Sequence, residues 1–208
     1  MTATTFVAIR HGRTAYNHQG LVQGQLDIPL DEKGMHQATM LRPRLAEYER
    51  CPVYTSDLIR ATRTAQLALP DREPVLLSAL RERDFASWQG NPYPSKEQRP
   101  SGRDIDFRPG GGESYREFLQ RGIGAFRTLC QQHPGETVLV FSHGGLIRAV
   151  FSWALGLHIN QMGRFQLDNV SLSLLKMDPH EGPFVVSLND TSHLAGRNEK
   201  ELAGQEEK

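Results

Sequence analysis

The chain has 208 residues, of which 38% are hydrophobic and 23% charged, a composition typical of a globular protein with one well-filled domain. Its 24 lysines and arginines balance its 24 aspartates and glutamates, so no overall field attracts nucleic acid or an anionic membrane. The two cysteines, Cys51 and Cys130, form neither a disulfide framework nor a metal-ligand pattern. With no basic segment preceding an apolar one at the N-terminus, a cytoplasmic protein is predicted.

Apolar runs alternate with helical patterns in the first eighty residues. A buried strand is predicted at Phe6–Ile9, and a helix begins after its N-cap Asp31. Pro43 within this helix is expected to kink it or end it early. Four apolar residues recur at the three- to four-residue spacing of one helix face: Met35, Ala38, Leu41 and Leu45. The pattern continues with a strand at 52–55, a helix capped by Ser56 and ending near Leu69, and an apolar run at 75–80.

The second half of the chain repeats this alternation after a polar segment. Residues 91–112 are rich in Pro and Gly and lack periodicity, which predicts a lid-like excursion across the domain. The further predicted elements are a helix over 113–133, a strand over 137–141, a helix over 146–157, strands over 170–177 and 184–188, and a flexible charged tail over 195–208.

This alternation predicts the α/β class, with a mostly parallel central sheet and helices on both faces, which is a three-layer α/β/α sandwich. Residues 1–194 are predicted to form a single domain. The first strand ends in Arg10-His11-Gly12, and Ser142-His143-Gly144 follows a later strand in the same way. Since the carboxyl ends of parallel strands share one edge of a sheet, the two histidines are expected side by side.

Two arginines, Arg10 and Arg60, and the two imidazoles would together favour a doubly charged anion such as phosphate. The glycines after each histidine would let backbone N–H groups approach it. Taken alone, a strand-end histidine is equally well explained by a hydrogen bond to a backbone carbonyl. A serine-hydrolase elbow, a P-loop and a zinc-binding histidine pair are each disfavoured, because their motifs are absent.

Arg10-His11-Gly12-Arg13-Thr14 resembles the Arg-His-Gly-x-Thr signature of the histidine phosphatase superfamily, phosphoglycerate mutase-like branch. Further motifs of that family are matched in order along the chain: Asn17, Gln23-Gly24, Asp27–Leu30, Ser56–Ala61, Leu80–Glu82, Trp88–Gly90, Gly111–Ser114 and Ser142–Gly145.

The resemblance implies a phosphoglycerate mutase-like fold and a metal-independent phosphomonoesterase that acts on small phosphorylated metabolites through a phosphohistidine. It implies His11 as nucleophile and Glu82 as general acid and base. It also implies Arg10, Arg60 and His143 as catalytic residues that hold the equatorial phosphate oxygens and neutralise their charge. Neither a metal nor another cofactor is expected, and the partner is a small phosphate ester rather than nucleic acid or membrane. The residues implied in phosphate or substrate binding are Arg10, Asn17, Gln23, Gly24, Arg60, His143 and Gly144.

Three positions depart from the family pattern. In the acid motif, Ala86 replaces the usual Gly and Gln89 the usual Glu, and Gly145 stands where mutases have Asn. With the short 91–112 excursion, Gly145 favours a phosphatase over the alternative, a 2,3-bisphosphoglycerate-dependent mutase. A further alternative is an inactive phosphate-binding protein. The physiological substrate and the oligomeric state stay open, with a homodimer as one alternative.

Several further side chains are assigned no contact with substrate. Trp88, Tyr115 and Phe118 are expected to pack in the interior. The arginines of the 91–112 excursion, Arg99, Arg103 and Arg108, are expected to be solvated rather than to form a second anion site.

Overall fold

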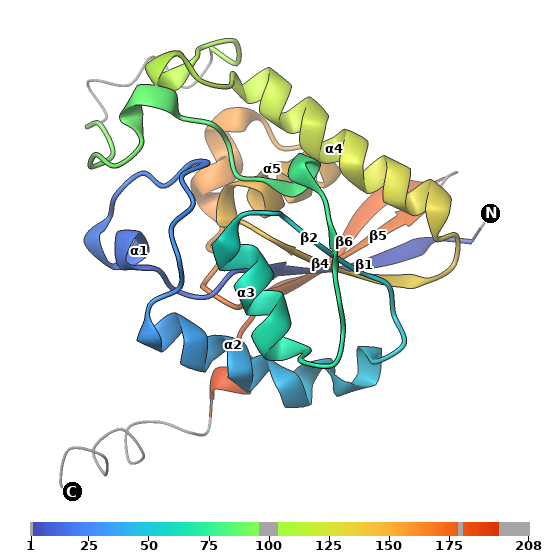
Figure 1. Cartoon of the computed structure of the whole chain (residues 1–208). Helices are drawn as coiled ribbons and strands as arrows, with labels where there is room; N and C mark the ends of the chain where they lie inside the picture. Colours follow the sequence, from blue (N-terminus) through green and yellow to red (C-terminus); the bar gives the residue numbers. More distant parts are fainter. Residues whose placement is uncertain (1, 96–103, 179–180, 196–208) are drawn as a thin grey trace, which may run out of the picture.

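A six-stranded sheet with strand order β3-β2-β4-β1-β5-β6 lies at the centre of the protein (Figure 1). The computed structural model describes residues 2–95, 104–178 and 181–195. The strands are β1 (Thr4–Arg10), β2 (Val53–Thr55), β3 (Val75–Leu76), β4 (Thr137–Ser142), β5 (Leu172–Asp178) and β6 (Gly182–Asp190). Three of the five pairings are parallel, and the two involving β5 are antiparallel. The predicted sheet is therefore confirmed as mostly parallel by a narrow margin.

Helices cover both faces of the sheet, as predicted. In Figure 1, α2 and α3 lie on one side of the sheet, and α4 and α5 on the other. The helices are α1 (Ala15–Gln19), α2 (Glu32–Leu45), α3 (Ile59–Ala68), α4 (Tyr115–Gln132) and α5 (Gly144–Ala154). Short 3₁₀ helices occupy Ala46–Tyr48, Ser78–Leu80, Ala86–Trp88, Pro109–Gly111, Ile159–Arg164 and Ser192–Leu194.

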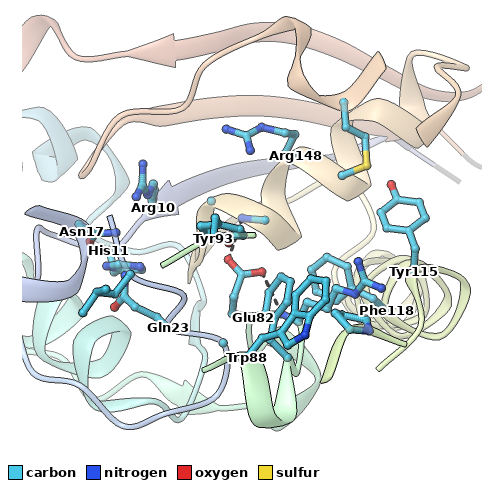
Figure 2. A pocket seen from close by; sticks show the side chains of 18 of the residues that line it. Arg10, His11, Asn17, Gln23, Glu82, Trp88, Tyr93, Tyr115, Phe118 and Arg148 are labelled. Carbon is cyan, nitrogen blue, oxygen red and sulfur yellow. Dashed lines mark hydrogen bonds between the residues drawn. The ribbon is translucent and has the colours of Figure 1, made fainter. Parts of the chain in front are cut away.

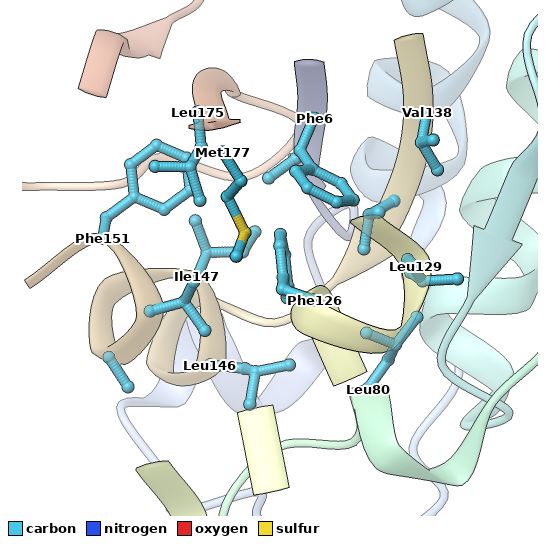
Figure 3. Close-up of a cluster of buried hydrophobic side chains, with 14 of the residues drawn as sticks. Phe6, Leu80, Phe126, Leu129, Val138, Leu146, Ile147, Phe151, Leu175 and Met177 are labelled. Atoms are coloured by element: carbon cyan, nitrogen blue, oxygen red, sulfur yellow. The ribbon is translucent and has the colours of Figure 1, made fainter. Parts of the chain in front are cut away.

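Strand β1 joins the two hydrophobic cores. Phe6 and Ala8 face the core beneath α4 and α5 (Figure 3), while Val7 and Ile9 face the core beneath α2 and α3. All four side chains are fully buried. Because side chains alternate along a strand, only a continuous apolar run can fill both cores at once, which explains the opening pattern of the sequence.

Helix α2 differs from its prediction in two ways. It runs through Pro43 to Leu45 instead of ending early. Pro43 itself is exposed, whereas Leu41 and Leu45 are fully buried, so packing of the last turn outweighs the roughly 3 kcal/mol that an interior proline costs. Met35 is 38% exposed and is not part of the buried face, where Gly34 lies instead.

The predicted cap of α3 is wrong. Leu58, not Ser56, is the N-cap residue, and it makes no side-chain capping bond. The carboxylate of Asp27 instead accepts a 2.6 Å hydrogen bond from the backbone N–H of Ile59, the first residue of the helix. Ser56 is thereby free to serve the site described below.

Some predictions concern segments outside the described residues. The tail predicted over 195–208 is described only at Ala195, and the 91–112 excursion lacks 96–103. Arg99 and Arg103 fall in that undescribed segment, whereas Arg108 forms an exposed ion pair with Glu117, consistent with a solvated surface position. Among the described residues, no helix combines the length and apolar character needed to cross a bilayer.

Candidate active site

The two histidines of the repeated motif meet at the carboxyl edge of the sheet. Strands β1 and β4 are parallel neighbours, with Arg10 paired to Ser142, so His11 and His143 follow at the same level. Their ring centroids lie 5.2 Å apart. This part of the prediction is confirmed, and it follows directly from the register of the two strands.

His11 is held as a neutral imidazole of defined tautomer. Its Nδ1 lies 2.7 Å from the carbonyl oxygen of Gly12, which can only accept, so Nδ1 carries the proton. Nε2 then has an unshared electron pair. Burial lowers the pKa of His11 well below its usual value, and the positive charges of Arg60 and Arg10 lower it further. The residue that sequence analysis proposes as nucleophile is therefore in a nucleophilic form at neutral pH.

Two glycines allow the backbone after β1 to pack tightly against α2. A Cβ on Gly12 would lie 2.5 Å from the carbonyl oxygen of Gly34, and one on Gly34 would lie 2.0 Å from that of Arg13. The N–H of Gly12 also donates a 3.0 Å hydrogen bond to the Thr64 hydroxyl on α3. The carbonyl that orients His11 belongs to the next peptide, whose N–H, that of Arg13, donates a 3.1 Å hydrogen bond to the side-chain oxygen of Gln37.

Arg60 and His143 form a fully buried pair behind His11. Arg60 Nε donates to His143 Nδ1 at 3.2 Å, so the proton of His143 is on Nε2, which lies 2.8 Å from the Ser56 hydroxyl. The other guanidinium nitrogens of Arg60 donate to the carbonyls of Gly24 and Leu26. Burial lowers the pKa of Arg60 to about 10, which leaves it charged at neutral pH. The role of Ser56 was missed because it depends on a contact 87 residues away in the chain.

Arg10 presents an unused donor. Its Nη1 donates to the carbonyl of Leu167 at 2.5 Å, but its buried Nε has no hydrogen-bond partner. A Cβ on Gly144 would lie 3.1 Å from this nitrogen. The first residue of α5 therefore lies against Arg10, and both backbone and guanidinium donors are available to one anion.

Glu82 is positioned by backbone groups. Its Oε1 accepts a 2.9 Å hydrogen bond from the N–H of Arg83, and its Oε2 accepts a 2.8 Å bond from that of Gly145 (Figure 2). Arg121 on α4 holds the same segment by donating to the carbonyls of Glu82 and Arg81. The carboxyl group thus lies over the start of α5, opposite His11 in the same cavity.

A cavity of about 520 Å³ lies at this edge of the sheet. The predicted residues that line it are Arg10, His11, Asn17, Gln23, Gly24, Arg60, Glu82 and Gly144. His143 is not among the lining residues, and both of its ring nitrogens are engaged by Arg60 and Ser56, so its direct contact with phosphate stays a prediction.

The cavity also contains residues outside the individual site residues that the sequence predicts. Tyr115 and Phe118 pack in the interior as expected, whereas Trp88 is half-buried against Phe107, and all three line the cavity. Arg148 lines it too, four residues after Gly144 on α5, a spacing that could have indicated it. The sequence places the substrate-specificity surface on residues 13–25, the Trp88 loop and residues 91–112, and several lining residues come from these segments. The remaining lining residues are Leu21, Arg83, Phe85, Tyr93, Asp104, Phe107, Pro109, Gly145 and Met162.

The described residues contain no group of three or more histidine, cysteine or acidic side chains placed to hold a metal ion. The fold is of the α/β class, and at the edge of its sheet a buried histidine shares a cavity with arginine side chains. Residues 6–191 match the family model for the histidine phosphatase superfamily, branch 1. The chain therefore belongs to that superfamily, and the family resemblance of its motifs is confirmed.

Relatives cover nearly the whole chain. The metal-independent phosphoserine phosphatase of Arabidopsis thaliana is 34% identical and covers 92% of this chain and 84% of that protein. A probable phosphoglycerate mutase of Cronobacter sakazakii is 31% identical, and the match covers 89% of this chain and 93% of that protein. A crystal structure of an Entamoeba histolytica phosphoserine phosphatase mutant with phosphoserine matches with a TM-score of 0.83 at 28% sequence identity. The match covers 92% of this chain and 99% of that structure. The predicted fold and enzyme class, a phosphatase of the histidine type, are confirmed.

Proposed function

We propose that the chain hydrolyses phosphate monoesters of small metabolites by a two-step transfer through His11, within one domain of residues 1–194. The observation that carries this proposal is the state of His11. The ring is neutral, its Nδ1 proton is held by Gly12, and its free Nε2 shares a cavity with cationic side chains. A neutral imidazole beside two fixed guanidinium groups is suited to attack a phosphorus atom.

In the first step, the Nε2 lone pair of His11 forms a bond to phosphorus as the bond to the ester oxygen breaks. Glu82 in its acid form gives its proton to the leaving oxygen, so that an alcohol departs. Arg10 and Arg60 stabilise the charge on the equatorial oxygens. His143 and Ser56 act as positioning residues, because they fix the Arg60 guanidinium.

In the second step, Glu82 as a carboxylate removes a proton from a water molecule that attacks the phosphohistidine. The phosphorus–nitrogen bond breaks, inorganic phosphate is released, and both His11 and Glu82 return to their starting forms. No electron donor and no metal is required, since side-chain cations neutralise the charge that develops.

Two amide side chains support this assignment of the binding site. The side-chain oxygen of Asn17 accepts hydrogen bonds from the backbone N–H of Thr14 and from Asn169. The side-chain oxygen of Gln23 accepts one from the Thr14 hydroxyl at 2.9 Å. With both oxygens engaged, the amide nitrogens are left to donate to phosphate.

The test is hydrolysis of p-nitrophenyl phosphate in EDTA, combined with trapping of the phosphoenzyme from a ³²P-labelled ester. We expect activity in EDTA and an acid-labile, alkali-stable phosphoenzyme. His11→Ala should abolish both, and Glu82→Gln should slow turnover of alkyl phosphates by about 10²- to 10⁴-fold. Turnover that survives His11→Ala would contradict the phosphohistidine.

The assay also separates the alternatives. Phosphoserine and 3-phosphoglycerate are the first metabolites to test, since named relatives act on or bind them. Rapid interconversion of 2- and 3-phosphoglycerate with negligible release of inorganic phosphate would favour the mutase. Phosphate binding without any turnover would favour an inactive binding protein.

A further inference from the structure

Arg148 is a cation in the cavity without a protein partner. It lines the cavity from α5, and among the described residues it makes neither an ion pair nor a hydrogen bond, while its Nε is buried. A buried polar nitrogen without a partner is costly, so such a group in a cavity indicates a ligand that completes it.

The other arginines of the cavity either donate hydrogen bonds to the protein or belong to the proposed phosphate site. Arg60 donates to two carbonyls and to His143. Arg83 donates to the carbonyls of Glu113 and Phe107. Arg10 lies against Gly144, where the proposed phosphate binds. Arg148 is thus the cavity arginine that has neither a protein acceptor nor a place in the proposed phosphate site.

The position of Arg148 suits a second group on the same substrate. It lies one helical turn, about 6 Å, beyond Gly144, and in Figure 2 its guanidinium extends toward Arg10. The pKa of Arg10 is lowered chiefly by burial and also by the positive charge of Arg148, which agrees with the two cations being near each other. An anionic group a few bonds from the phosphate ester would relieve this repulsion.

Charge balance identifies the kind of anion. Four arginines and two carboxylates, Glu82 and Asp104, line the cavity. In the proposed first step Glu82 carries a proton, so the lining side chains then have three positive charges in excess, and a phosphate dianion neutralises two of them. Asp168, Asp27 and Glu113 lie outside the lining but reduce the positive potential at Arg10, Arg60 and Arg83. The small excess that remains favours a single carboxylate over a second phosphate dianion.

We propose that Arg148 is a specificity residue that binds a carboxylate on the leaving alcohol, so the preferred substrates are phosphorylated hydroxy or amino acids. This inference rests on the proposed phosphatase function and adds the chemistry of the leaving group to it. Arg offers a planar fork that matches a carboxylate in two hydrogen bonds, and Arg148 presents it from a half-buried position in the cavity.

The test compares pairs of esters that differ in the carboxylate alone. Phosphoserine is paired with phosphoethanolamine, and 3-phosphoglycerate with glycerol 3-phosphate. For the wild type we expect kcat/KM to be about 10- to 100-fold higher for the carboxylated member of each pair. Arg148→Gln should remove this preference while changing kcat/KM for the uncarboxylated esters and p-nitrophenyl phosphate by less than about threefold.

Controls keep the result specific. Arg127→Gln removes an arginine that lies over Trp153 outside the cavity and should preserve the preference. Arg148→Lys keeps the charge but loses the fork, so it should retain part of the preference. The thermal midpoint of each variant establishes that it is folded.

Three outcomes would overturn the inference. An equal loss on all esters in Arg148→Gln would make Arg148 part of the phosphate site or of the structure. A preference for fructose 1,6-bisphosphate over fructose 6-phosphate that depends on Arg148 would assign a second phosphate instead. Hydrolysis of p-nitrophenyl phosphate without any carboxylate preference would refute this inference alone, whereas no hydrolysis of any ester would refute the proposed function.

Discussion

Replacing Gly145 by Ala tests whether Glu82 acts as the general acid from the position in which the structure holds it. A Cβ at residue 145 would lie 2.1 Å from Glu82 Oε1 and 2.7 Å from its Cδ. Both distances are far below van der Waals contact, so the carboxyl group has to move and lose its 2.8 Å hydrogen bond from the Gly145 N–H. Losing a positioned general acid typically costs a factor of about 10² to 10⁴ in rate.

The leaving group distinguishes a lost acid from general damage. An alkyl alcohol needs a proton as it departs, whereas p-nitrophenolate leaves readily without one. For Gly145→Ala we therefore expect kcat to fall by about 100-fold or more on glycerol 3-phosphate and by less than about tenfold on p-nitrophenyl phosphate. Equal losses on the two esters, or no loss on either, would refute the assignment of Glu82.

A matched glycine provides the control. Gly124 lies within α4, and no heavy atom is found within 4 Å of the Cβ that an alanine would add. Gly124→Ala should leave both activities unchanged and stabilise the protein by up to about 1 kcal/mol, since alanine is the better helix former.

Further predictions concern stability. Burial lowers the pKa of His11 and of His143, so the unfolded chain takes up protons below pH 6.5 that the folded chain does not. As the pH is lowered below about 6.5, the free energy of unfolding should decrease by up to about 1.4 kcal/mol per pH unit for each histidine. A free energy of unfolding from urea denaturation that is the same at about pH 7.5 and about pH 5.5 would contradict this. Ser56→Ala removes the acceptor of the buried His143 N–H and should lower the free energy of unfolding, measured by urea denaturation, by about 1–3 kcal/mol. The control Ser87→Ala changes an exposed serine and should lower it by less than about 0.5 kcal/mol. Ala86 has a φ of +39°, so Ala86→Gly should raise stability by about 0.5–1 kcal/mol, seen as a higher thermal midpoint.

The sheet and the two histidines could be predicted because they depend on patterns that the chain repeats. A strand buried on both faces needs a continuous apolar run, and two such runs end in the same way at Arg10-His11-Gly12 and Ser142-His143-Gly144. Parallel strands then bring the ends together without any further information. Glu82 has no comparable local signal, and only the family resemblance indicated it.

The errors arose where a contact between distant segments decides the outcome. Ser56 lies shortly before a helical pattern, which favours a cap, but its hydroxyl binds His143 at the start of α5. The carboxylate of Asp27 caps α3 instead. Pro43 is tolerated because buried neighbours hold the last turn of α2. Neither outcome can be derived from local preferences, since both depend on tertiary packing.

The departures from the family pattern acquire physical meaning in the structure. Gly145 leaves room for the carboxyl group of Glu82, which a side chain at this position would displace. Gln89 accepts a 2.6 Å hydrogen bond from the N–H of Gln25 beside Gly24, so it supports the loop that carries the carbonyl bound by Arg60. Ala86 occupies a backbone conformation that favours glycine, which explains the glycine usual at this position.

A chain of zero net charge thus concentrates cations at one edge of its sheet, and the same arrangement sets both reactivity and stability. Burial and the neighbouring arginines keep His11 neutral. The charge of Arg148 acts on Arg10, where Glu82 and Asp168 offset part of it, and neither arginine forms an ion pair among the described residues. An anion that binds both groups relieves their repulsion and thereby stabilises the fold, by about 2.7 kcal/mol at a concentration of 100 Kd. Substrate recognition and folding are therefore coupled through the same two side chains. A carboxylated phosphate ester should consequently raise the thermal midpoint of His11→Ala, which binds but does not turn over, more than its uncarboxylated counterpart does at the same concentration.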